Sequence, residues 1–365
     1  MIKILVLFIL PFIFISCQES TNDELRIGFV AGLTGKYSTT GADIRDGFML
    51  AFDDIDYRIN NQKIKIIQKD DKQDPVIAKE IIEYFIKNNI QLIVGNTTSS
   101  MTRISLKTLK NKNNFLLASA IASSNKFSHI DDNFIRIQVE DSEKQYSKLN
   151  TYLKKHNIKK VFYIYDKNNY TYTKGYFDFY QNVLIKNNAE KFIAYKAIQD
   201  GYDVIIDNLK KIDYDMILIV ASSSDTANLI QHIKINKINK KIMISEWAYT
   251  NDFIEFGGKS IDGVIVSSGY DKYSNDKDYL KFIKKFKNKY NKDASMYSVK
   301  GYELAKILIK NIEKTRDISK LKELILKEKI YKGLQGKINF DKYGDVSRDY
   351  FLLKVINDKF QRISN

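Results

Sequence analysis

The sequence has one cysteine, two prolines and three histidines in 365 residues. A single cysteine excludes an internal disulfide framework and a zinc site built on several cysteines. The histidines, His129, His156 and His232, are scattered and lack metal-ligand spacing. No dinucleotide fingerprint or nucleophile elbow accompanies them, so we expect no cofactor, no metal and no catalysis.

The charge is strongly positive but not arranged for nucleic acid. The formal net charge is +15, yet only eight of the 59 basic residues are arginine, and acidic residues are interleaved throughout. Arginine is the residue best suited to phosphate and base recognition. We therefore interpret the excess as lysine on solvated faces and expect no nucleic-acid partner.

A glycine-rich stretch, GLTGKYSTTG at residues 32–41, resembles a phosphate-binding loop at first sight. The loop pattern requires a glycine where Val30 stands and a hydroxyl where Tyr37 follows Lys36. Two of its four fixed positions fail, so a nucleotide site is not expected there. Lys36 is expected to be a surface lysine.

The first seventeen residues, MIKILVLFILPFIFISC, are an apolar run behind an early lysine. The run is short for a transmembrane helix and is typical of a secretory signal peptide. Its end resembles the lipobox of bacterial lipoproteins, although Phe14 stands where leucine is usual. We expect a signal peptide over 1–17, a lipid on Cys17 and a polar tether over 18–24. The alternative is an incidental cysteine beside an uncleaved anchor.

Apolar runs then alternate with segments of helical periodicity. In the first part, strands are expected at 25–33, 63–71, 90–95 and 114–120, and helices at 41–55, 74–88 and 96–111. The same rhythm restarts after Asp141, and three helices and two strands close the chain from residue 277. This alternation predicts an α/β fold with doubly wound parallel sheets, in which ligands bind beyond the carboxyl ends of the strands.

Several marks in order resemble the type I periplasmic binding proteins, specifically the branched-chain amino acid (Leu/Ile/Val) branch of ABC-transporter substrate-binding proteins. They run from IGFVAGLTGKYSTTGADIRDGFMLAFDDI through DDKQDPVIAKE, IVGNTTSS, FIRIQVED and GYDV to GLQGKINFDKYGD. The resemblance implies two Rossmann-like lobes joined by a three-crossing hinge. Lobe 1 is expected to be 25–140 plus 273–335, and lobe 2 to be 141–272 plus 336–365.

The resemblance also implies a site for a small ligand between the lobes. A free amino acid needs donors for its carboxylate and an anion for its ammonium. GNTTSS supplies hydroxyls and backbone N–H groups at a helix start, which favours an anion. By the resemblance, Ser99 holds the carboxylate, helped by the backbone of Ala120 or Ile121, and the Ser123 hydroxyl is a further candidate. Simple N-capping by Ser99 or its neighbour is the alternative.

The other half of the implied site lies in lobe 2. Glu246 follows an apolar strand, at the position where the family pairs an acid with the ligand's ammonium; a cap or a solvated acid is the alternative. The remaining residues implied by the resemblance line the cleft: Thr40, Tyr170, Ser222, Ser223, Trp247 and Tyr297. Thr171 departs from the glycine usual after the tyrosine matched by Tyr170.

The implied function is capture of an amino acid-type ligand outside the cytoplasm, from a lipid-anchored position, and delivery to the permease and ATPase of an ABC importer. A ligand-sensing component of the same fold, binding an amide, urea or a short peptide, is the alternative. An enzyme on this scaffold would need a motif that the sequence lacks.

Overall fold

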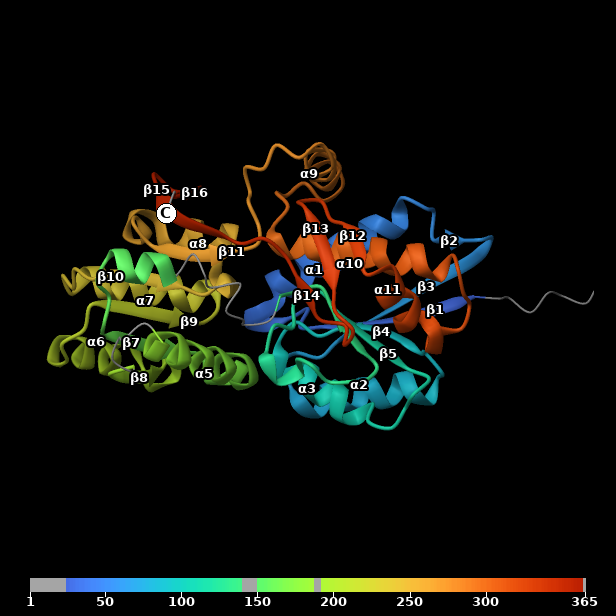
Figure 1. The fold of residues 1–365 in the computed structure, drawn as a ribbon, viewed down its shortest axis with the longest axis horizontal. Helices are drawn as coiled ribbons and strands as arrows, with labels where there is room; N and C mark the ends of the chain where they lie inside the picture. Colours follow the sequence, from blue (N-terminus) through green and yellow to red (C-terminus); the bar gives the residue numbers. More distant parts are fainter. Residues whose placement is uncertain (1–23, 140–149, 187–191, 364–365) are drawn as a thin grey trace, which may run out of the picture.

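The computed structural model describes residues 24–139, 150–186 and 192–363 (Figure 1). The predicted signal peptide, Cys17 and the tether up to residue 23 lie outside the described residues. The described part forms two α/β lobes that lie side by side. The predicted α/β fold with two sheet-based lobes is confirmed. Within the described ranges, no helix has the length and apolar character that a membrane span requires.

The first lobe contains a six-stranded sheet with the order β2-β3-β1-β4-β5-β6. All its pairings are parallel except that of β2 with β3. The strands are β1 (Leu25–Ala31), β2 (Arg58–Ile59), β3 (Gln62–Asp70), β4 (Leu92–Gly95), β5 (Leu116–Ser119) and β6 (Phe134–Arg136). The central strands are nearly continuous apolar runs because helices cover both faces.

The helices of this lobe come from both ends of the chain. They are α1 (Ser38–Asp53), α2 (Pro75–Lys87), α3 (Ser99–Thr108), α9 (Lys277–Tyr290), α10 (Met296–Ile312) and α11 (Leu321–Glu328). Two glycines let α1 and α10 touch. A Cβ at Gly47 would lie 1.9 Å from the Ser298 carbonyl oxygen, and one at Gly301 would lie 2.2 Å from that of Ile44. Glycine at these positions therefore fixes α10 closely against the first lobe.

The second lobe contains a seven-stranded sheet with the order β16-β15-β11-β10-β9-β7-β8. Its strands are β7 (Val161–Tyr165), β8 (Ala194–Ala197), β9 (Met216–Val220), β10 (Lys241–Ile244), β11 (Ile265–Ser268), β15 (Phe351–Ile356) and β16 (Lys359–Arg362). The first five are parallel, and β15 and β16 add an antiparallel edge. The helices are α5 (Tyr170–Lys186), α6 (Tyr202–Lys211), α7 (Ser223–Ile235) and α8 (Asn251–Gly257).

The last boundary between the lobes differs from the expected one. β12 (Ile330–Lys332), β13 (Lys337–Phe340) and β14 (Val346–Ser347) form a small antiparallel sheet, and the Arg136 N–H of β6 donates to the Gly344 carbonyl over 3.1 Å. Residues 336–347 therefore lie with the first lobe, which corrects the expectation that 336–365 belong to the second. Only β15 and β16 join the second lobe, so the described elements pass between lobes after β6, β11 and β14.

A buried ion pair holds the end of the first lobe together. Arg136 is fully buried, and its Nε donates to Asp345 Oδ1 over 2.7 Å. Its Nη1 donates to the carbonyls of Ser124 (2.8 Å) and Ala122 (3.2 Å). The pair thus joins β6, the loop after β5 and the turn between β13 and β14.

The glycine-rich stretch of the first lobe reaches the second lobe. Lys36 lies at the surface as expected, but its ammonium also pairs with Asp166 Oδ2 at 3.1 Å and with Asp225. Tyr37 donates its hydroxyl to the same Asp166 oxygen over 2.8 Å. Asp166 is fully buried at the end of β7. We call Lys36, Tyr37, Asp166 and Asp225 the interlobe latch.

Asp345→Asn is expected to lower the free energy of unfolding by about 3–5 kcal/mol, because it leaves the Arg136 guanidinium buried without its counter-charge. Urea denaturation measures this loss. Asp349→Asn is the matched control, since Asp349 is exposed and its replacement should change stability by less than about 0.5 kcal/mol. Equal effects of the two substitutions would contradict the account of the buried pair.

Lys36→Met is expected to weaken the contact between lobes by about 1–2 kcal/mol, because it removes a charged donor from the buried Asp166. Small-angle scattering of the unliganded chain should then show a larger radius of gyration. Lys107→Met, at an exposed position on α3, is the control and should leave the scattering unchanged. An unchanged radius in Lys36→Met would show that the latch does not hold the lobes.

Candidate functional site

A cavity lies between the lobes at the carboxyl ends of the strands, where open α/β sheets bind ligands. From the first lobe it is lined by Thr97, Thr98, Ser99, Ile121, Ser123, Gln138, Met296 and Tyr297. From the second lobe it is lined by Asn169, Tyr172, Tyr176, Glu246, Trp247 and Ser267. Its volume is about 40 Å³, which is room for only a few water molecules.

Hydroxyl groups at the start of α3 line the cavity from the first lobe. Ser99 is buried at the first position of the ten-residue helix α3, directly after β4. Thr98 caps the helix: its Oγ1 accepts from the Met101 N–H and donates to Gln73. Ser123, in the loop after β5, also lines the cavity. The positive end of the helix dipole and these hydroxyls together favour a carboxylate.

From the second lobe, the buried carboxylate of Glu246 lines the same cavity. Oε1 accepts from Ser268 Oγ (2.6 Å) and the Gly269 N–H (2.9 Å). Oε2 accepts from Gln138 Nε2 (2.8 Å) and the Tyr350 hydroxyl (3.3 Å). A carboxylate offers about four lone-pair positions, so these donors fill it. Gln138, Ser268 and Tyr350 each lie where the chain passes between lobes, so Glu246 ties all three crossings together.

A buried lysine is linked to Glu246 through Gln138. Lys300 of α10 is 2% exposed and donates its ammonium to Gln138 Oε1, the oxygen of the amide that binds Glu246. Burial lowers the pKa of the Lys300 ammonium to about 8, against the attraction of the Glu246 carboxylate. The sequence analysis missed Lys300. The spacing in the sequence could have indicated Lys300. It falls four residues after Met296 and three after Tyr297, which places it on the same face of the helix as these two cavity-lining residues.

Aromatic rings form much of the cavity wall. Trp247 stacks on Tyr37 of the first lobe with ring centroids 5.7 Å apart, and meets Tyr172 edge-on at 5.9 Å. Tyr297 donates its hydroxyl to the Trp247 carbonyl over 2.8 Å. Rings from both lobes therefore meet at Trp247.

The structure brings six of the predicted ligand residues to the cavity: Ser99, Ile121, Ser123, Glu246, Trp247 and Tyr297. Thr40 and Ala120 are not among its lining residues. Thr40 is half-buried in α1, and Ala120 is buried in the core.

The two predicted serines of α7 are engaged elsewhere. Ser222 caps the helix, accepting from the Asp225 N–H at 3.4 Å, and Ser223 accepts from the Thr250 hydroxyl at 2.8 Å. Neither lines the cavity.

The prediction for Tyr170 is corrected by its position. Its side chain is 53% exposed and lines a separate surface hollow with Tyr165 and Tyr195. Asn169 and Tyr172, on either side of it in sequence, face the cavity instead. Thr171, which stands where the family usually has glycine, was the sequence feature that could have indicated a different arrangement of this segment.

The sequence analysis missed eight of the residues that line the cavity: Thr97, Thr98, Gln138, Asn169, Tyr172, Tyr176, Ser267 and Met296. Thr97 and Thr98 stood within the GNTTSS motif. The others come from segments whose approach depends on how the lobes pack.

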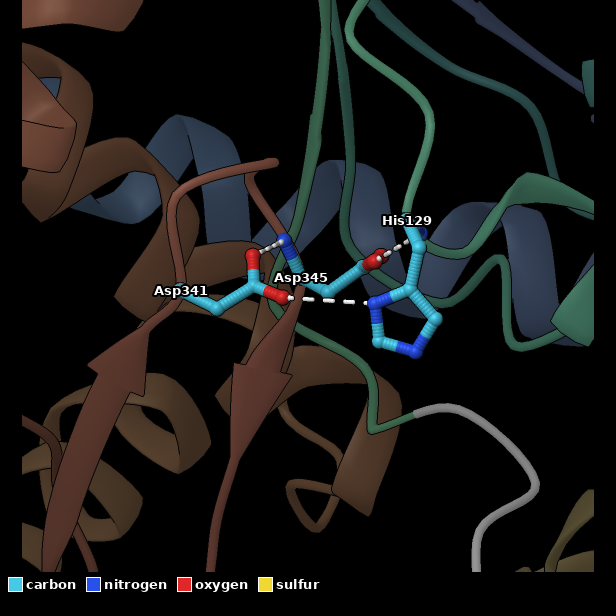
Figure 2. Close-up of side chains that lie close together, drawn as sticks. All are labelled: His129, Asp341 and Asp345. Carbon is cyan, nitrogen blue, oxygen red and sulfur yellow. Dashed lines mark hydrogen bonds and ion pairs between the residues drawn. The ribbon is translucent and has the colours of Figure 1, made fainter.

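A second cluster of ionisable groups lies outside the cavity (Figure 2). His129 Nδ1 lies 3.8 Å from Asp341 Oδ2, and the His129 N–H donates to Asp345 Oδ2 over 2.9 Å. The other Asp345 oxygen accepts from Arg136, and Asp341 Oδ1 accepts three backbone N–H groups of its own turn. A cation would compete with the Arg136 guanidinium, so these bonds explain the cluster as a brace for the β13–β14 turn.

Comparison with known proteins identifies the family. A family model described as a periplasmic binding protein matches residues 24–359. The Leu/Ile/Val-binding protein of Escherichia coli strain K12 is 19% identical over 268 residues, which is 72% of this chain and 72% of that protein.

Solved structures share the fold. The substrate binding protein LivJ from Streptococcus pneumoniae, solved in complex with isoleucine, has a TM-score of 0.81 and 18% identity, covering 93% of this chain and 98% of its own. A solute binding protein from R. palustris, in complex with benzoate, has a TM-score of 0.84 and 14% identity, covering 93% and 95%. The chain therefore belongs to the type I periplasmic binding proteins, in the family that includes the Leu/Ile/Val-binding proteins.

Proposed function

We propose that this chain is the substrate-binding lipoprotein of an ABC importer, anchored outside the cytoplasm through Cys17. It captures a small amino acid-type ligand between its lobes and delivers it to the permease and its ATPase. The observation that carries the proposal is the cavity between the lobes, which is lined by buried hydroxyls at the start of α3 in the first lobe and by the buried Glu246 carboxylate in the second. Capture requires no covalent chemistry, so the chain is not an enzyme.

The ligand's carboxylate is assigned to the α3 end. Ser99 is placed to donate to it, and the helix dipole and the loop carrying Ile121 and Ser123 support the same charge. In an amino acid the ammonium would face Glu246. Trp247 and Tyr297 would contact the side chain.

Entry requires the lobes to separate, because a cavity of about 40 Å³ is far smaller than a leucine-sized molecule. Besides the stacking of Trp247 on Tyr37, polar contacts join the lobes. The interlobe latch is one set of these polar contacts. In a second set, the Ser100 N–H donates to Asn169 Oδ1 and the Ser100 hydroxyl accepts from the Thr171 N–H, each over 3.2 Å. Such contacts are exchangeable with water, which suits a hinge that opens and closes.

A sensing role with an amide, urea or short peptide as ligand is the second candidate. The filled lone pairs of Glu246 favour a ligand without an ammonium, a condition that simple amides and urea satisfy. A neighbouring permease gene would favour transport, and a neighbouring sensor kinase gene would favour sensing. The Glu246→Gln variant does not separate the two, since it also breaks bonds to all three crossings.

A thermal-shift screen tests capture directly. The chain from Gln18 onward is expected to be stabilised by at least one amino acid or other small carboxylate. A ligand at about a hundred times its dissociation constant adds roughly 2.7 kcal/mol, which gives a clear rise in melting temperature. Amides, urea and sugars complete the panel. A shift with none of these compounds would contradict the proposed function, and a shift with sugars alone would overturn the assigned site.

Ser99→Ala is expected to weaken binding of whichever carboxylate stabilises the chain. Loss of a hydrogen bond to a charged group costs about 1.5–3 kcal/mol, or roughly ten- to hundredfold in the dissociation constant. Calorimetric titration measures it. Thr40→Ala is the control, because Thr40 does not line the cavity. The dissociation constant of the same ligand should be unchanged in this variant. A larger effect at Thr40 than at Ser99 would place the carboxylate elsewhere.

A further inference from the structure

Lys300 is a buried cation that capture of an amino acid does not require. It is 2% exposed within α10, and its ammonium donates to Gln138 Oε1. The amide nitrogen of the same Gln138 side chain donates to Glu246 Oε2. One amide therefore connects a buried ammonium to the carboxylate that an amino acid's own ammonium would need.

We infer that Lys300 determines specificity, and that the cavity selects a small monocarboxylate whose second end carries no charged amine. This inference rests on the proposed capture of a small carboxylate between the lobes, and it replaces the amino acid by a carboxylate that has no amine. The Lys300 ammonium compensates the charge of the Glu246 carboxylate, which the ammonium of a bound zwitterion would otherwise compensate. The matching ligand is then an anion held by the α3 end, with an uncharged hydrocarbon or aromatic body.

The balance of charges around the cavity supports this selection. Glu246 and Lys300 are both buried and carry opposite charges. The next buried charges, Glu303 and Arg348, are paired with each other at 2.5 Å. The formal charges therefore cancel, and the dipole of α3 adds a positive end. A zwitterion would bring a second ammonium toward a carboxylate that is already compensated, which is unfavourable at low dielectric. A monoanion adds only the charge that the α3 end favours.

The hydrogen bonds lead to the same conclusion. An incoming ammonium must displace at least one of the four donors on Glu246, and each displaced donor would be left in a buried place. Gln138 could not leave without also releasing Lys300. The carboxylate end has no such competition, because Ser99 and Ser123 are hydroxyls that can reorient to donate.

Matched ligand pairs test the inference on the mature chain after dialysis. Leucine is compared with 4-methylpentanoate, and phenylglycine with phenylacetate, by calorimetric titration; each pair differs only in the amine. In the wild type the amine-free member is expected to bind about tenfold more tightly or better. In Lys300→Met the order should invert, since Glu246 then needs a cation. Lys300→Arg keeps the charge and should keep the wild-type order.

The outcomes separate this inference from the proposed function. Tighter binding of leucine or phenylglycine by the wild type would overturn the role of Lys300 while supporting amino acid capture. Binding of neither pair by a folded wild-type chain would overturn the inference, while the thermal-shift screen still decides the proposed function. If Lys300→Met does not fold, the wild-type order of the pairs still decides the inference.

Discussion

The carboxylate of Glu246 is the interaction on which the arrangement of the two lobes depends. It accepts from one donor or more at each of the three places where the chain passes between lobes: Gln138, Ser268 with Gly269, and Tyr350. The same side chain lines the cavity. The Glu246 carboxylate therefore belongs both to the hinge and to the proposed binding site. A ligand that changes the hydrogen bonds of Glu246 also changes the hydrogen bonds that join the three crossings.

The two lobes contribute different chemistry to the cavity. The first lobe presents hydroxyls at the start of α3, and the second presents Glu246 and most of the aromatic wall. In the arrangement of the structure both sets line one cavity, and polar contacts such as that of Tyr37 with Asp166 help to hold the lobes together. A ligand that bridges both lobes binds the closed form better and shifts the population toward it, by no more than its difference in affinity for the two forms.

The fold and one end of the site could be predicted from the sequence because their signals are local. Strand-helix alternation fixes two sheets, and a hydroxyl run before a helix places Ser99 where an anion can bind. The role of Lys300 could not be predicted this way, because it depends on Gln138, which arrives from another element.

The errors have similar causes. Residues 336–347 were assigned to the wrong lobe because strand partners are chosen by tertiary packing. Tyr172 lines the cavity and Tyr170 does not, because a motif match cannot tell which way a helix start faces. Lys36 lies at the surface as predicted. Its pairing with Asp166 and Asp225 could not be predicted, because these partners lie more than a hundred residues away.

The most direct measurement is a fluorescence titration of Trp247 with amino acids and simple carboxylates. Trp247 is the only tryptophan of the chain and stacks on Tyr37 across the cleft, so its emission reports this cavity and the contact between lobes. The account predicts a saturable change in emission with at least one carboxylate, weakened strongly in Ser99→Ala. An emission unchanged by every compound, in a chain that circular dichroism shows to be folded, would contradict it.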